Sequence, residues 1–207
     1  MPGAAAVTIW CDVAPEVKDE YDDWHVHEHS PERLAIPGFL RGSRWVSVDG
    51  RNAYFILYEL ESLSVLTAGP YLERLNDPTP WSRQMMPHHR NMVRSLCSVE
   101  SSFGVGLGAA MLTIRLTHSI GTELLASLPA RRGLVSARLL RDAGAVQGAE
   151  TTEQKIRGGD QSAEWIVLVN GYSVNALESL AANELNDAAP GSVMRIYNLA
   201  YTLTGRP

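Results

Sequence analysis

Four side chains that could move a proton lie within one short stretch of the sequence, at His25, Glu28, His29 and Glu32. Because an α-helix repeats every ~3.6 residues, spacings of three and four place all four on one side of a helix. An imidazole accepts and returns a proton near neutral pH, and a carboxylate on its other nitrogen fixes the tautomer. We therefore expect His29 to transfer the proton, with Glu28 or Glu32 as its partner and His25 beside them.

The helix that carries these groups is predicted from an apolar stripe at Val17, Tyr21 and Trp24. One more turn of that stripe reaches Glu28, which places a carboxylate at the edge of a core, where pKa values shift. We expect the helical pattern to break at Pro31. Structural alternatives remain. His29 could stabilise the turn at Pro31, and Glu28 could form a structural ion pair with Arg33 or Arg44 at the edge of the core. The whole stretch could also be a solvated, charged helix end.

Further side chains are candidates for binding a substrate. Arg44, on the strand after this helix, could hold a carboxylate or an enolate oxygen. Alternation along the strand sends Arg44 and Trp45 to opposite faces, so one of them at most lines a site. We add four more candidates, at Trp24, Tyr58, Trp81 and His88. This set would suit proton transfer next to a carbonyl in an aromatic-lined pocket, and such isomerisation, dehydration or aldol-type cyclisation needs no cofactor.

A metal site is the main alternative use of the histidines. His25 and His29 stand four residues apart, a spacing that offers two ligands to one ion, and His88 and His89 could add more. Val26, however, stands where the helical zinc hydrolase motif has its glutamate. A haem-ligand role for His88, which tryptophan and methionine residues precede, is weaker still. The prediction is therefore that the protein uses no metal and no cofactor.

Composition excludes several classes of partner. The chain has 207 residues, of which 45% are hydrophobic and 20% charged, as in globular proteins that bury a sizeable core. A net charge of −5 argues against nucleic acid, whose phosphates need a basic face. No apolar run approaches the ~20 residues of a membrane span, and no signal peptide is evident. Cys11 and Cys97 are predicted to be buried free thiols, which suits the cytoplasm.

The strand and helix patterns occur in the order β-α-β-β-α-β, and this order occurs twice. The expected strands are 5–13, 39–48, 53–60, 92–99, 110–117, 134–142, 164–171 and 193–202, with helices from about 15 and over 62–76, 121–131 and 174–185. The class is therefore α+β, with two tandem ferredoxin-like units, 1–103 and 109–207, forming an intrachain α/β barrel. We expect one site per chain, built by the first unit, and a disordered polar connection over 144–162.

The first half resembles the dimeric α/β-barrel superfamily, and within it the EthD-like branch. The resemblance covers about residues 5–100 and rests on the segments 23–31 and 37–39 together with Leu34, Arg41 and Arg44. His29 matches the family's histidine, whereas His25 stands where the family commonly has an aromatic residue. The second half is similar only in its element order, so the chain looks like a fused repeat with a degenerate second copy.

The resemblance implies a ligand between the sheet and the helices of one unit, lined by the helix histidine. The superfamily includes isomerases, polyketide cyclases, cofactor-free monooxygenases and haem-dependent enzymes, so the fold does not decide the function. We predict a cofactor-independent lyase, isomerase or cyclase acting on a small, mostly apolar carbonyl compound. The alternatives are a non-catalytic small-molecule-binding or stress-related barrel and a cofactor-free monooxygenase. Exposed edge strands could also drive formation of a homodimer.

Overall fold

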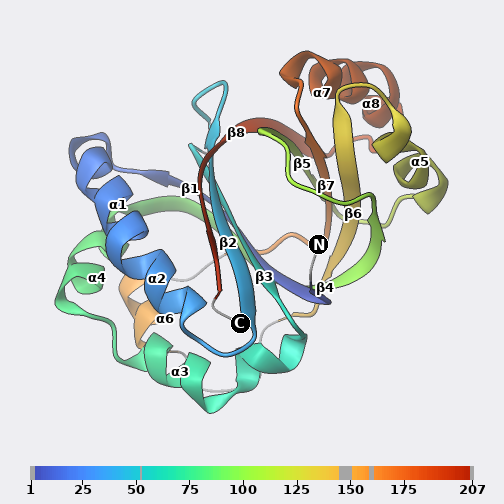
Figure 1. The fold of residues 1–207 in the computed structure, drawn as a ribbon. Helices are drawn as coiled ribbons and strands as arrows, with labels where there is room; N and C mark the ends of the chain where they lie inside the picture. The colour runs from blue at the N-terminus through green and yellow to red at the C-terminus, as the bar shows by residue number, and fades with distance from the viewer. Residues whose placement is uncertain (1–2, 52, 145–150, 159–160, 206–207) are drawn as a thin grey trace.

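Eight antiparallel strands close into a barrel in the order β1-β3-β2-β8-β5-β7-β6-β4 (Figure 1). The computed structural model describes residues 3–51, 53–144, 151–158 and 161–205. The strands are β1 (Ala5–Val13), β2 (Phe39–Ser47), β3 (Tyr54–Leu60), β4 (His89–Phe103), β5 (Ala110–Leu116), β6 (Leu134–Asp142), β7 (Trp165–Gly171) and β8 (Val193–Thr204). The α+β class and the closed barrel are confirmed.

The two halves of the chain contribute four consecutive strands each, in matching order. Read in one direction around the barrel, the first half runs β4-β1-β3-β2 and the second runs β8-β5-β7-β6. Two seams join them, where β2 pairs with β8 and β4 pairs with β6. Both edges of every one of these strands are therefore paired. The open edge strands that we expected to drive self-association do not occur in the described barrel.

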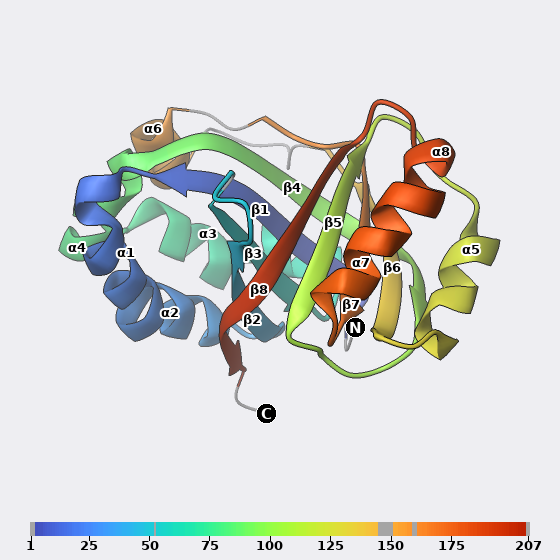
Figure 2. The same cartoon turned by 90° about the horizontal axis from the view of Figure 1, so that it is seen from above.

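The helices cover the barrel on two opposite sides. They are α1 (Lys18–Trp24), α2 (Ser30–Leu34), α3 (Gly69–Asn76), α4 (Pro80–Met85), α5 (Thr122–Ser127), α6 (Thr152–Arg157), α7 (Val174–Leu180) and α8 (Asn186–Ala188). In Figure 2, α1 to α4 lie on one side and α5, α7 and α8 on the other, whereas α6, from the second half, joins the first group. No helix in the described part of the chain is long and apolar enough to cross a membrane.

Large side chains from both halves fill the inside of the barrel. Trp10, Trp45, Phe55 and Tyr197 are almost fully buried there, in a cluster that draws on all eight strands. Successive residues of a strand face opposite sides of the sheet. Trp45 therefore points into the barrel and Arg44 points outward, toward α1, as the alternation predicted.

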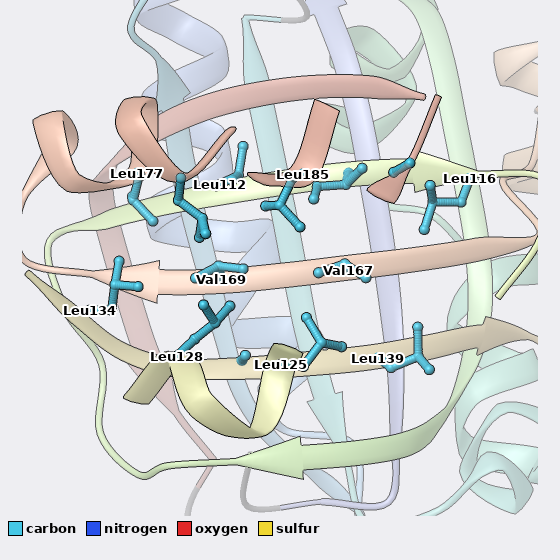
Figure 3. Close-up of a cluster of buried hydrophobic side chains, with 14 of the residues drawn as sticks. Leu112, Leu116, Leu125, Leu128, Leu134, Leu139, Val167, Val169, Leu177 and Leu185 are labelled. Carbon is cyan, nitrogen blue, oxygen red and sulfur yellow. The ribbon is translucent and has the colours of Figure 1, made fainter. Parts of the chain in front are cut away.

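Leucines fill the space between the sheet and the helices of the second half. Leu125 and Leu128 from the α5 side and Leu177 from α7 pack on Leu112 and Val169 of the strands (Figure 3). All five side chains are buried. The corresponding space in the first half contains histidines and arginines among its apolar and aromatic side chains, so the cleft with chemically reactive groups lies in the first half.

Three expectations about the elements were wrong. The helix does not break at Pro31, because α2 includes Pro31 and ends at Leu34. The chain then turns at Pro37-Gly38, where Gly38 has φ +90°. The helix α4 lies between the expected helix over 62–76 and the expected strand over 92–99, where no helix was expected. The connection 144–162, expected to be disordered, contains α6. Asn52, between the expected strands 39–48 and 53–60, and residues 145–150 and 159–160 of that connection lie outside the described residues.

Candidate active site

The helix that carries the histidines contains a π-helical turn over His25–His29, between α1 and α2. At this turn the backbone N–H of Ser30 donates to the carbonyl of His25, one residue farther than in an α-helix. The extra residue rotates the downstream helix α2 relative to a regular helix. His25 and His29 both line the cleft between the helices and the outer face of the sheet, whereas Glu28 and Glu32 do not.

This cleft is small, with a cavity volume of about 40 Å³. It therefore has room for a few water molecules. Its lining residues are Val7, Ile9, Tyr21, Trp24, His25, His29, Arg33, Phe39, Ile56, Tyr58, Tyr71, Leu75, Met86, His89, Met92, Arg94, Glu153 and Arg157.

The two helix histidines are neutral groups in a buried setting. His25 is 1% exposed, its Nδ1 lies 3.0 Å from the Ser30 hydroxyl, and its Nε2 has no hydrogen-bond partner in the described protein. His29 keeps some exposed surface, but its Nδ1 is shielded and likewise unpartnered, and its ring lies 4.4 Å from that of Trp24. Burial is the main cause that lowers the pKa of both imidazoles well below 6.5. The second cause is a nearby positive charge, from Arg44 for His25 and from Arg33 for His29.

These pKa values make stability depend on pH. Above pH ~6.5 both histidines are neutral in the folded and unfolded chains. Below it the unfolded chain takes up protons that the folded chain cannot, so the free energy of unfolding should fall by ~1.4 kcal/mol per pH unit for each histidine. We expect this loss in urea unfolding between pH 6.5 and 5. A His25→Asn/His29→Gln variant should show a flatter dependence, and an unchanged slope would contradict the assignment.

An ion-paired group of three side chains closes one wall of the cleft. Arg33 of α2 donates to Glu153 of α6, and Arg157 donates to the other oxygen of Glu153 from 3.4 Å. The side chains of Arg33 and Glu153 are 5% and 3% exposed. A capping box positions α6, because Thr151 accepts from the Gln154 amide and the Gln154 side chain accepts from the Thr151 amide. The second half thus completes a site that we expected the first half to build alone.

Aromatic hydroxyls and a third histidine complete the lining. A carbonyl only accepts, so His89 Nδ1 donates to Met86 O at 2.9 Å, and in the neutral ring Nε2 accepts from the Tyr21 hydroxyl at 3.2 Å. Burial raises the pKa of Tyr58 to about 12, so its hydroxyl stays a donor. Tyr58 was predicted as a lining residue and does line the cleft, whereas His89 was predicted only as an alternative metal ligand.

Glu28 anchors α4 and does not contact His29. Its Oε1 accepts from Thr79 Oγ1 at 2.5 Å, from Trp24 Nε1 at 3.2 Å and from Ser82 Oγ at 3.3 Å. The expected pairing of Glu28 with His29 was therefore wrong in geometry, and so was its alternative pairing with Arg33 or Arg44. The physical reason is the π-helical turn, which directs Glu28 sideways toward α4.

Glu28→Gln is expected to lower the free energy of unfolding by about 1–2 kcal/mol, because a neutral amide replaces a charged acceptor of three hydrogen bonds. Urea unfolding measures the change, with Glu73→Gln, an exposed glutamate of α3, as the matched control. The same variant should leave proton transfer at His29 unchanged. A loss of stability no larger than in the control would contradict the anchoring role.

The other predicted site residues lie outside the cleft. Glu32 forms an ion pair with Arg74 of α3 at 3.1 Å, which removes it as a partner of His29. Arg44 forms an ion pair with Asp22 of α1 at 3.0 Å. Trp81 and His88 do not line the cleft either. The indole N–H of Trp81 donates to Glu20.

The histidines do not gather into a metal-binding group. His25 and His29 lie with their ring centroids 5.6 Å apart, and each has an unpartnered nitrogen in the cleft. Across the described ranges, no set of three or more His, Cys, Asp or Glu side chains is placed to hold a metal ion. The donor set of the cleft is instead imidazole, phenol and guanidinium, which suits acid–base chemistry and anions.

The comparisons with known proteins identify the fold. No protein-family model matches the chain, and no curated protein matches it in sequence. An anthrone oxidase-like protein superposes with a TM-score of 0.63 at 13% identity, over 98% of this chain and 93% of that one. A candidate monooxygenase from Fusobacterium nucleatum superposes with a TM-score of 0.59 at 8% identity, over 99% of this chain and 96% of that one. Another, from Lactobacillus acidophilus, superposes with a TM-score of 0.57 at 9% identity, over 98% of this chain and 97% of that one. The chain therefore shares the fold of these proteins, and in this chain that fold is a closed barrel.

Proposed function

We propose that the cleft is the active site of a cofactor-independent enzyme that removes a proton from a small, mostly apolar carbonyl compound. One observation carries the proposal. His25 Nε2, His29 Nδ1 and Arg33 Nη1 are buried in the same cleft, and none of them has a hydrogen-bond partner among the described protein groups. Buried polar atoms are normally satisfied, so a set of unsatisfied ones in a single cleft indicates a ligand site.

His29 is the proton acceptor in this proposal. It is neutral, and unlike His25 it keeps exposed surface through which the proton can leave to solvent. The C–H bond next to the carbonyl breaks, the proton moves to His29, and the electron pair moves onto the carbonyl oxygen. Arg33 and the Tyr58 hydroxyl supply the positive charge and the donor that stabilise this oxygen. Return of the proton to another atom gives isomerisation, and loss of a leaving group gives a lyase.

A cofactor-free monooxygenase is the second candidate, and the likeness to an anthrone oxidase-like protein and two candidate monooxygenases favours it. The first step would be the same proton transfer. The carbanion would then add to O₂, and the resulting hydroperoxide would lose water across its C–H and O–O bonds. One methylene and one O₂ thus become one carbonyl and one water. A mostly apolar, aromatic lining suits this reaction, because it keeps bulk water from the carbanion.

Anthrone is a suitable probe, because its methylene is acidified by the conjugated carbonyl. Under nitrogen in D₂O, we expect the chain to accelerate exchange of deuterium into that methylene, as followed by proton NMR. In air, an oxygen electrode separates the two candidates, since a monooxygenase consumes one O₂ for each anthrone whereas an isomerase or lyase consumes none above the background. If anthrone binds without accelerated exchange, the cleft belongs to a non-catalytic binding protein.

The two halves of the chain are, in this proposal, two fused ferredoxin-like units over 1–103 and 109–207. Their matching strand orders, β4-β1-β3-β2 and β8-β5-β7-β6, support the fusion. The histidine on the first helix and the Pro37-Gly38 turn support an EthD-like first unit. The leucine-filled second unit would then be the copy that lost its cleft.

A further inference from the structure

A small polar cavity lies inside the barrel, at the end where residues 104–109 connect the two halves of the chain. Its volume is about 20 Å³. Leu57, Met111 and Leu168, which belong to the cluster inside the barrel, line it together with Glu59 and Arg138. Among the described residues, this cavity shares no lining side chain with the active-site cleft. It is therefore a separate site, and its ligand goes beyond the proposed function.

Glu59 of β3 brings to this cavity a carboxylate oxygen that requires a donor. Its side chain is 1% exposed, and its Oε2 accepts from Arg41 Nε. Its Oε1 is shielded from solvent and has no hydrogen-bond partner among the described protein groups. A buried carboxylate oxygen without a donor is costly.

Arg138 of β6 brings a donor that requires an acceptor. The residue is 5% exposed, and its Nη1 donates to the carbonyls of Phe103 at 3.0 Å and Ala137 at 3.1 Å. Its Nε is shielded and has no partner among the described protein groups. Burial lowers the pKa of Arg138, and the nearby carboxylate of Glu59 opposes that shift. The two charged groups therefore lie close to each other without an ion pair between them in the described structure.

These two unmet requirements restrict the chemistry of a ligand. An anion would satisfy Arg138 Nε but would be repelled by Glu59 Oε1, and a cation would have the opposite difficulty. A water molecule both donates and accepts, so it satisfies both atoms. One water needs roughly 10–15 Å³ of cavity volume, so a cavity of about 20 Å³ holds one water and no organic molecule.

We propose that this cavity is a binding site for a single water molecule, which donates to Glu59 Oε1 and accepts from Arg138 Nε. Because β3 belongs to the first half of the chain and β6 to the second, the water joins the two halves inside the barrel. The cover of the cavity is held in place by Asn170 of β7, which accepts from the Gly108 amide and donates to the carbonyl of Ala110 at 2.8 Å. The water should therefore exchange slowly with the solvent.

A crystal structure of the full chain, from crystals soaked in rubidium bromide, tests the proposal directly. We expect one peak of electron density within hydrogen-bond distance of both Glu59 Oε1 and Arg138 Nε. Rubidium and bromide scatter anomalously and water does not, so we expect no anomalous signal at this peak. An anomalous peak would identify an ion. A direct contact between Glu59 and Arg138, or the absence of any density, would leave no bridging water. Each of these three results would overturn the proposal.

A second measurement counts long-lived water molecules in solution, by magnetic relaxation dispersion of the water oxygen-17 nucleus. Ser136 lines the cavity and is 3% exposed, so the two methyl groups of Ser136→Val should fill it. We expect this variant to hold one long-lived water fewer than the wild type. Ser119→Val, at an exposed serine, is the matched control and should keep the wild-type count. An unchanged count in Ser136→Val would overturn the proposal. The crystal structure needs no variant, so it decides the question even if Ser136→Val does not fold.

Discussion

Replacement of Glu153 by alanine is expected to lower the free energy of unfolding by about 3–5 kcal/mol, the range for removing one partner from a buried ion pair. The carboxylate is almost fully buried and pairs with both Arg33 and Arg157. Its loss leaves the buried guanidinium of Arg33 without its ion-pair partner and removes one partner from Arg157, and neither group can shed its proton. Urea unfolding at pH 7 measures the change.

The matched control is Glu178→Ala, an exposed glutamate of α7 that should shift stability by no more than about 0.5 kcal/mol. Replacing all three charged groups together, Arg33→Met/Glu153→Leu/Arg157→Met, should restore most of the loss, because no unpaired buried charge remains. If Glu153→Ala proved as mild as the control, the ion-paired group would not hold α6 to the barrel.

The position of Glu153 marks a limit of prediction from the sequence. The glutamate lies 120 residues from Arg33, in a polar connection whose composition is typical of disorder. A local signal was nevertheless present. Thr151 and Gln154 have the spacing of a capping box, and Gly158 follows at a left-handed helix end, which together predict the short helix α6. No local pattern, however, predicts the far side of the barrel on which that helix packs.

The barrel itself could be predicted because its signals are periodic and redundant. Alternation fixed both the strands and the opposite directions of Arg44 and Trp45. The site was predicted only in part, because its geometry depends on one irregular turn. Equal helical spacing placed Glu28 and Glu32 with the histidines, but the π-helical turn over His25–His29 separates them. Such a turn depends on packing against the sheet and α4, which the local sequence does not record.

His29→Gln is expected to slow anthrone deuterium exchange by about 10²–10⁴-fold, the usual contribution of a positioned general base. Glutamine keeps a polar side chain of similar reach but cannot take up the proton. Because the pKa of His29 is lowered, the wild-type rate should persist below pH 6.5 and fall only where the folded imidazole protonates. His27→Gln is the matched control, since His27 is on the same turn and exposed outside the cleft lining, and it should keep the full rate.

The same experiment distinguishes a base from a packing residue. A purely structural role for His29 would lower stability and rate together, whereas a base would lose rate while urea unfolding at pH 7 stays near wild type. His25→Asn separates the two histidines, because His25 is closed off from solvent and held by Ser30. If His25→Asn alone abolished exchange, the base would be His25. Full exchange in both variants would mean that neither histidine is the base, and the proposed function would be wrong.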